Sequence, residues 1–195
     1  PALAAAFAKK NMDQVRRRIG LSMRFIQVVA MPCTVGMIVL AHPIIKLLYP
    51  GASDLAGSLI QAGGISIIFY SISTLSNAVL QGIDQMRIPI RNAVIALAAN
   101  IAAVPVSLYV FNLNIYTMIA GNIVFSLVMC ILNGLSVKKH SGFRPNIVKT
   151  FVKPAAASVI MGAAVFGVYH ITYKVTGINS VCTILSIVAG IIVYA

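Results

Sequence analysis

The residue types that usually carry catalysis or metal binding are few in this sequence and stand far apart. The three acidic residues and three histidines are Asp13, Asp54, Asp84, His42, His140 and His170. Enzymatic chemistry needs an acid, a base, a nucleophile or metal ligands brought together. The sequence has no paired carboxylates, no His-x-x-x-His pair, no Gly-x-Ser-x-Gly elbow and no phosphate-binding glycine loop. We therefore expect no enzyme, no catalytic residue, no metal site and no cofactor.

Amide side chains inside apolar segments form a second group with possible function. The candidates for a substrate pathway are Asn77, Gln81, Asn92, Asn100, Asn122 and Asn133, together with Arg24. An amide that faces lipid is costly, so each should face a neighbouring helix or a wet cavity. Interhelical hydrogen bonding is the structural alternative for any one of them. The set as a whole favours a cavity among the segments 55–81, 89–111 and 115–137.

Arginines at segment ends are candidates for contact with a phosphate or headgroup. They are Arg16, Arg17, Arg18, Arg87 and Arg91. Attraction to anionic lipid headgroups, at about 1 kcal/mol per residue, is the alternative explanation. For Arg24 the two alternatives are snorkelling to the interface and binding an anionic substrate headgroup.

Two prolines are candidates for hinges between moving parts. Pro32 and Pro105 lie inside apolar segments, where proline removes a backbone hydrogen bond. We expect a kink near Pro32. Prolines also occur in membrane helices without any role in movement.

The elements that position these residues are predicted to be membrane-spanning helices. The sequence is 59% hydrophobic and 9% charged, with a mean hydropathy of +0.95, which is more apolar surface than a soluble domain could bury. We expect an all-α integral membrane domain over residues 25–195, truncated at both ends. Its six predicted spans are 25–48, 55–81, 89–111, 115–137, 154–173 and 178–195. Residues 1–24 should hold the end of a preceding span and a basic cytoplasmic juxtamembrane helix.

The basic residues predict the orientation of these spans. Thirteen of the fifteen Lys and Arg residues fall on one side if every segment spans, and only Lys46 and Lys174 fall on the other. By the positive-inside rule both ends of the chain are then cytoplasmic. The net charge of +12 is carried by loops and not by a continuous face with interleaved aromatics. We therefore expect no nucleic-acid partner.

Several short stretches, taken in order, resemble a known family of transporters. They are Pro1-Ala2-Leu3, Lys9-Lys10, Arg16-Arg17, Arg24, Pro32, Val35-Gly36, the run from Leu40 to Tyr49, Leu80-Gln81-Gly82, the run from Met86 to Pro89, and Lys138-Lys139 with Gly142. Their order and spacing resemble the multidrug/oligosaccharidyl-lipid/polysaccharide exporter superfamily over essentially the whole chain. The resemblance is to its polysaccharide-transport branch, which includes the stage V sporulation protein B group and the lipid II flippases. His42 stands where that family often has an acidic residue, so we assign no carboxylate role there.

The resemblance implies a MATE-like exporter fold, of which this chain would be the C-terminal part. It implies alternating access that moves an undecaprenyl-pyrophosphate-linked glycan across the bacterial cytoplasmic membrane, in cell-wall, spore-cortex or surface-polysaccharide synthesis. The expected partners are that lipid-linked glycan, anionic membrane lipids and the missing N-terminal helices of the same protein. The last two spans would contact the lipid tail.

Two other functions remain open from the sequence. A cation-coupled multidrug exporter of the same superfamily predicts an acidic residue deep inside a span, and none occurs here. A non-transporting membrane scaffold predicts that Asn77, Asn100 and Asn122 all lie in tightly packed pairs without a cavity.

Overall fold

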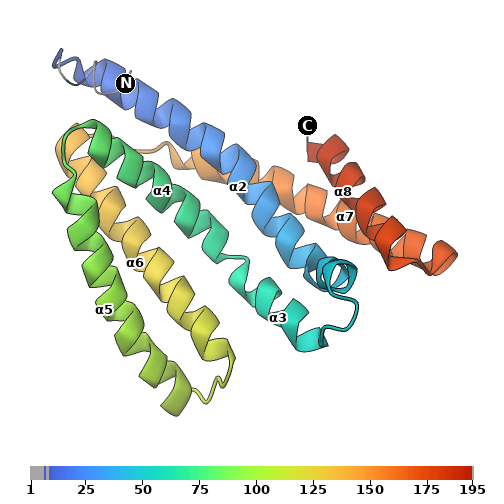
Figure 1. The fold of residues 1–195 in the computed structure, drawn as a ribbon. Helices are drawn as coiled ribbons and strands as arrows, with labels where there is room; N and C mark the ends of the chain where they lie inside the picture. Colours follow the sequence, from blue (N-terminus) through green and yellow to red (C-terminus); the bar gives the residue numbers. More distant parts are fainter. Residues whose placement is uncertain (1–6, 8, 195) are drawn as a thin grey trace.

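The computed structural model describes residues 7 and 9–194, and these residues form helices joined by short connections (Figure 1). The elements are α2 (Met12–Leu48), α3 (Asp54–Gly63), α4 (Ser66–Gly82), α5 (Arg87–Tyr109), α6 (Tyr116–Ser141), the π-helix η1 (Val148–Val152), α7 (Lys153–Thr176) and α8 (Asn179–Tyr194). The described residues contain no strand. The end of a preceding span, which we predicted at the start of the chain, lies outside them.

Within the part of the chain that the structure describes, four helical segments are long and apolar enough to cross a membrane. They are α2, α5, α6 and the continuous stretch Val148–Thr176 formed by η1 and α7. The bent pair of α3 and α4 adds a fifth if it counts as one span. α8 is apolar but has only 16 residues, and a span needs about 20. The all-α membrane fold is therefore confirmed, while the count of six spans stays a prediction.

The basic segment and the first predicted span form one helix. α2 begins at Met12, where the side-chain oxygen of Asn11 accepts a hydrogen bond from the backbone N–H of Gln14 at 3.1 Å. This cap satisfies one of the free amides at the helix start. No helix end occurs near residue 24, because the basic residues of the first turns are good helix formers.

The span predicted over 55–81 is bent in the structure. It divides into α3 and α4, which meet at an angle of 44°. The break lies at Gly63 and Gly64, and a Cβ atom built on Gly64 would stand 2.7 Å from Cγ1 of Ile38. Only glycine allows this close approach to α2.

The connection left between the predicted spans 115–137 and 154–173 is shorter in the structure. α6 continues through Lys138 and Lys139 to Ser141, and Gly142 ends it in the left-handed region at φ +66°. Glycine is the residue best suited to this helix end, and the lysines complement the negative end of the helix dipole. Only residues 142–147 then connect α6 to η1.

The tripeptide Asn112-Leu113-Asn114, which lies between the predicted spans 89–111 and 115–137, separates α5 from α6 in the structure. Asn112 and Asn114 have φ values of +51° and +46°. Asparagine tolerates this left-handed conformation better than most residues, which is why this tripeptide was a usable turn signal inside a long uncharged stretch.

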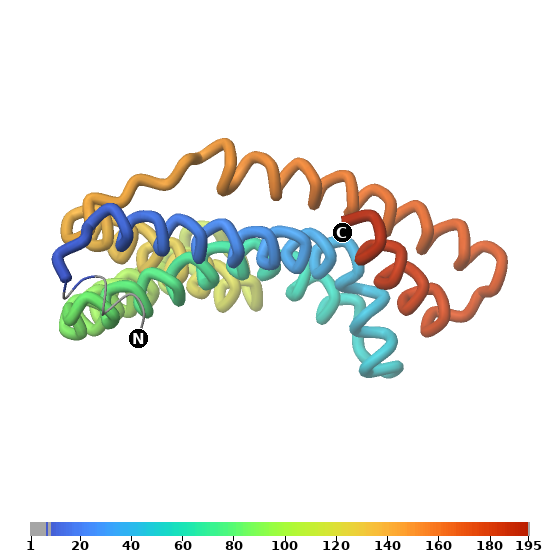
Figure 2. The backbone as a smooth tube through the Cα atoms, turned by 90° about the horizontal axis from the view of Figure 1, so that it is seen from above, coloured from blue at the N-terminus to red at the C-terminus, as the bar shows by residue number. Residues whose placement is uncertain are grey.

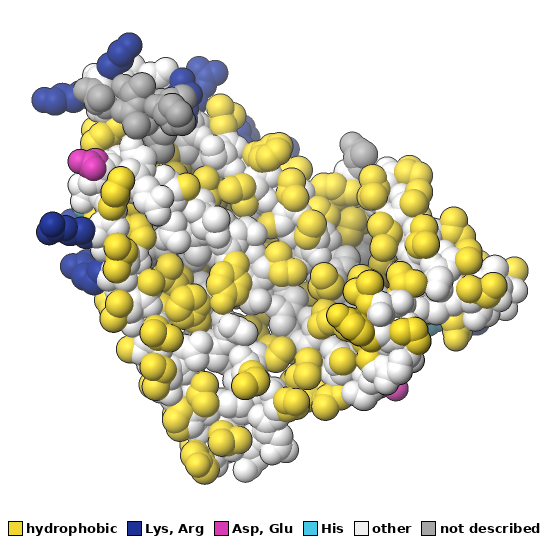
Figure 3. Space-filling model, in the orientation of Figure 1, with side chains coloured by type: hydrophobic (Ala, Val, Ile, Leu, Met, Phe, Trp, Pro, Cys, Tyr) yellow, Lys and Arg dark blue, Asp and Glu magenta, His cyan; other side chains and the backbone are white. Residues whose placement is uncertain are grey.

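The helices form two groups joined along α2. α4, α5 and α6 pack side by side, and α7 and α8 form a hairpin, while α2 contacts α3 and α4 on one side and α7 and α8 on the other (Figures 1 and 2). In Figure 3 the Lys and Arg side chains gather at one end of the visible face, and apolar side chains are spread over the rest. This separation of charge from apolar surface suits a membrane protein.

The visible turn in α2 lies nearer its end than the expected kink at Pro32. Pro32 and Pro43 are both inside the helix, and Figure 2 shows α2 turning in its last part, which contains Pro43. Proline cannot donate to the carbonyl four residues earlier, so the helix bends there. Pro105 lies inside α5, and the hinge roles of Pro32 and Pro105 stay predictions.

Candidate functional site

Three of the amides predicted for the pathway form one hydrogen-bonded bridge between helices. Nδ2 of Asn92 on α5 donates to Oδ1 of Asn133 on α6 at 2.9 Å, and Nδ2 of Asn133 donates to Oδ1 of Asn77 on α4 at 2.7 Å. Nδ2 of Asn92 also reaches Oγ of Ser136 at 3.3 Å. Asn133 is 0% exposed and Asn92 is 2% exposed.

Interhelical hydrogen bonding in this amide bridge accounts for the presence of Asn77, Asn92 and Asn133 inside apolar helices. Each amide donates or accepts across a helix boundary, which lowers the cost of placing it among apolar helices. The arrangement matches the interhelical alternative open for each amide, and it holds α4, α5 and α6 in register.

The other three amides have different surroundings. Asn100 is half-buried against α6, where a Cβ atom built on Gly121 would lie 2.9 Å from its Oδ1. Asn122 is exposed, and its Oδ1 accepts only a long hydrogen bond of 3.4 Å from the hydroxyl of Tyr70. Gln81 is also exposed. Exposed amides on membrane helices need water or further protein beside them.

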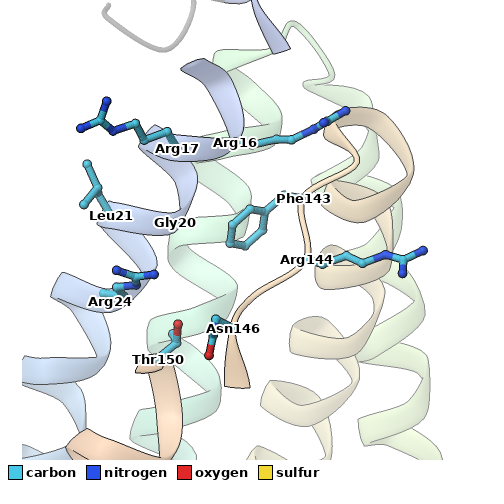
Figure 4. Close-up of a pocket in the computed structure, with 9 residues that line it drawn as sticks. All are labelled: Arg16, Arg17, Gly20, Leu21, Arg24, Phe143, Arg144, Asn146 and Thr150. Carbon is cyan, nitrogen blue, oxygen red and sulfur yellow. The ribbon is translucent and has the colours of Figure 1, made fainter. Parts of the chain in front are cut away.

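A basic pocket of about 500 Å³ opens beside the first half of α2 (Figure 4). Its walls are α2, the connection 142–147 and η1. The lining residues are Arg16, Arg17, Gly20, Leu21, Arg24, Phe143, Arg144, Asn146 and Thr150. The structure thus places Arg24 with Arg16 and Arg17 and apart from the amide bridge.

Arg16 is held by the end of α6. Its Nε donates to the backbone oxygen of Ser141 at 3.0 Å, and its Nη1 lies 3.5 Å from Asp13. The Ser141 carbonyl belongs to the last turn of a helix, where a cation is favourable. The remaining candidates, Arg18 on α2 and Arg87 and Arg91 on α5, are exposed and do not line the pocket.

An apolar groove of about 520 Å³ runs between α2, α7 and α8. The α2 wall carries Val28, Pro32, Gly36, Leu40 and Ile44, and Met161, Val165 and Gly190 belong to the opposite wall. At one end the hydroxyl of Tyr194 donates to the backbone oxygen of Val28 at 2.7 Å. The residues of the α2 wall recur at every fourth position, so they share one helix face that could have been found from the sequence. The sequences of α7 and α8 do not indicate which helix they would face.

Sequence reasoning also missed Gln27. This residue is 0% exposed, and neither polar atom of its side chain has a partner among the described residues. The feature that could have identified Gln27 is an amide side chain inside the apolar stretch after Arg24. The described residues also contain no group of three or more His, Cys, Asp or Glu able to hold a metal ion.

Comparison with protein families identifies a match over most of the chain. The family model for the lipid II flippase MurJ matches residues 1–188. Comparisons with curated proteins and with solved structures gave no match.

Proposed function

Because the chain belongs to the MurJ family of lipid II flippases, we propose that it translocates an undecaprenyl-pyrophosphate-linked cell-wall precursor by alternating access. The family and the apolar helices indicate a multi-pass protein of the bacterial inner membrane. The family is one of transporters and not of enzymes. We further propose that both ends of the chain are cytoplasmic and that additional N-terminal helices complete the transport cavity.

The apolar groove is the observation that carries this proposal. A polyprenyl chain needs a continuous hydrocarbon surface, and the groove between these helices offers one. A small polar substrate would not require such a surface. Its walls come from α2, α7 and α8, so the last two helices would contact the lipid tail. Its volume of about 520 Å³ can hold part of such a chain while the rest lies in the bilayer.

The multidrug alternative has weaker support in the structure. Coupling to cations would favour an acidic residue deep in a span. Asp13 lies in the first turn of α2, Asp54 in the first turn of α3, and Asp84 in the turn between α4 and α5. All three therefore lie at helix ends.

The scaffold alternative agrees with only part of the geometry. Asn77 is paired and Asn100 is packed, as a scaffold predicts. Asn122 is exposed, and the apolar groove is open. A scaffold requires neither an exposed amide nor an open groove.

Replacing Asn100 or Asn122 by Leu is expected to lower transport without lowering expression. Each change removes an amide that could bind sugar hydroxyls, and losing one such hydrogen bond should slow transport about two- to tenfold. The measurement is the initial rate of precursor translocation, normalised to protein in the membrane. Val94→Leu on the exposed face of α5 is the control. Unchanged rates in both Asn variants would remove these residues from the pathway.

Reconstitution tests the proposed function directly. The full-length protein, placed in liposomes with a fluorescent lipid-linked precursor, should move the label between leaflets faster than empty liposomes do. A cationic dye trapped in matched liposomes should not be exported. Dye export without precursor movement would favour the multidrug function, and neither activity in a well-folded protein would favour the scaffold.

A further inference from the structure

The basic pocket carries more positive charge than the described residues neutralise. Arg17, Arg24 and Arg144 have no carboxylate within 4.0 Å there, and Arg16 has only Asp13, whose side chain is 95% exposed. The whole sequence holds just three acidic residues. Positive charges that line one pocket repel one another, and a bound anion offsets this repulsion. The pocket is therefore suited to an anionic ligand.

Two neutral polar groups complete the inner wall. Thr150 is 2% exposed, and it lines the pocket. Oδ1 of Asn146 accepts from the backbone N–H of Lys149 at 3.1 Å, which leaves its amide hydrogens free to donate. In Figure 4, Arg24 and Thr150 face the same space from opposite walls, while Arg17 and Arg144 extend outward from its sides.

This donor set fits phosphate. A guanidinium group forms paired hydrogen bonds with phosphate oxygens. A hydroxyl and an amide can bind the remaining oxygens. All these groups can donate, and phosphate presents more acceptor oxygens than a carboxylate does.

The position of the pocket favours a lipid as the carrier of that phosphate. Leu21, which lines the pocket, is 56% exposed, and Phe25, the residue after Arg24, is 72% exposed. On a membrane helix such apolar side chains face hydrocarbon, so the pocket opens where headgroups meet the acyl region.

We propose that this pocket holds the phosphate of one anionic phospholipid, with Arg24 and Thr150 as inner contacts and Arg17 and Arg144 at the rim. The bound lipid ties α2 to the segment that leads into α7. Arg24 is thereby assigned to a resident lipid and not to the substrate pathway predicted from the sequence. The proposal does not depend on which precursor the protein transports.

Lipid retention in nanodiscs tests this assignment. The full-length protein is assembled in phosphatidylcholine discs containing a small fraction of phosphatidylglycerol, and the lipids that stay bound on release are counted by native mass spectrometry. We expect one phosphatidylglycerol to be retained. Arg24→Gln should weaken retention about tenfold, as expected for loss of a charge-assisted hydrogen bond. Arg24→Lys should weaken it too, because the paired hydrogen bonds are lost although the charge remains.

Arg18→Gln is the matched control. Arg18 lies on the same helix and carries the same charge, but it does not line the pocket. Its replacement should leave retention unchanged. Equal losses in Arg18→Gln and Arg24→Gln would show diffuse attraction to the membrane surface and overturn the proposal.

Thr150→Val and two competitors complete the test. Thr150→Val removes the inner hydroxyl without changing charge and should also weaken retention; wild-type retention in this variant would contradict the proposed inner contact. Inorganic pyrophosphate, added to discs without phosphatidylglycerol, should not bind with the same dependence on Arg24. If it does, the ligand is a soluble phosphate compound. Displacement of phosphatidylglycerol by equimolar undecaprenyl pyrophosphate would assign the pocket to the transported lipid instead.

Discussion

Replacing Gly36 by Phe is expected to stop translocation of the lipid-linked precursor while the protein stays folded. Gly36 lines the apolar groove, and a Cβ atom built there would lie 4.0 Å from its nearest neighbour, Cε of Met161. The position therefore has room for a side chain, and loss of a helical glycine adds stability. An aromatic ring would occupy space that we assign to the lipid tail. Losing tail contacts worth a few kcal/mol should reduce the transport rate at least about tenfold.

Gly167→Phe on α7 is the matched control for this experiment. A Cβ atom built on Gly167 has no neighbour within 4 Å, and the residue does not line the groove. Its variant should transport at the rate of the unmodified protein. Normal transport by Gly36→Phe, at a normal level in the membrane, would show that the groove does not carry the lipid tail.

Replacing Asn133 by Leu is expected to be the most destabilising single change in the amide bridge. Leucine cannot donate to Asn77 or accept from Asn92, so both interhelical hydrogen bonds of 2.7 and 2.9 Å disappear. Each such bond stabilises a membrane protein by about 0.6 kcal/mol on average, and a buried polar group left unpaired costs about 1–3 kcal/mol more. We expect the free energy of unfolding to fall by about 2–4 kcal/mol.

Equilibrium unfolding of the protein in bilayer discs measures this change. Asn122→Leu is the control, because Asn122 is exposed and makes only the 3.4 Å contact with Tyr70. The control should unfold within about 0.5 kcal/mol of the unmodified protein. If Asn133→Leu does the same, the bridge contributes nothing and its three amides become available for another role.

The membrane fold could be predicted because its determinants are local. Uncharged stretches of about 20 residues indicate spans whatever their neighbours are, and Asn112-Leu113-Asn114 indicates a turn by backbone preference alone. The glycine pair Gly63 and Gly64 indicates a possible bend from the sequence, but the contact with Ile38 of another helix could not be predicted. The continuation of α6 to Ser141 could not be predicted either, because charged residues occur as readily in a loop as in the last turn of a helix.

The candidate site could be predicted only in part. Residue type identified the buried amides as groups that need a partner, but pairing Asn133 with Asn77 and Asn92 required knowing which helix faces share an interface. The arginines before residue 25 were identified by charge. The pocket that they line was not identified, because Asn146 and Thr150 come from a segment more than a hundred residues away along the chain.

Exposure of lipid II on the outer leaflet of living bacteria tests the proposed function most directly. Cells depleted of their own lipid II flippase are supplied with the full-length protein, and lipid II accessible from outside is quantified together with growth. Our account predicts that exposure and growth are both restored, and that Gly36→Phe restores neither. A well-expressed protein that leaves lipid II inside the cell would contradict it.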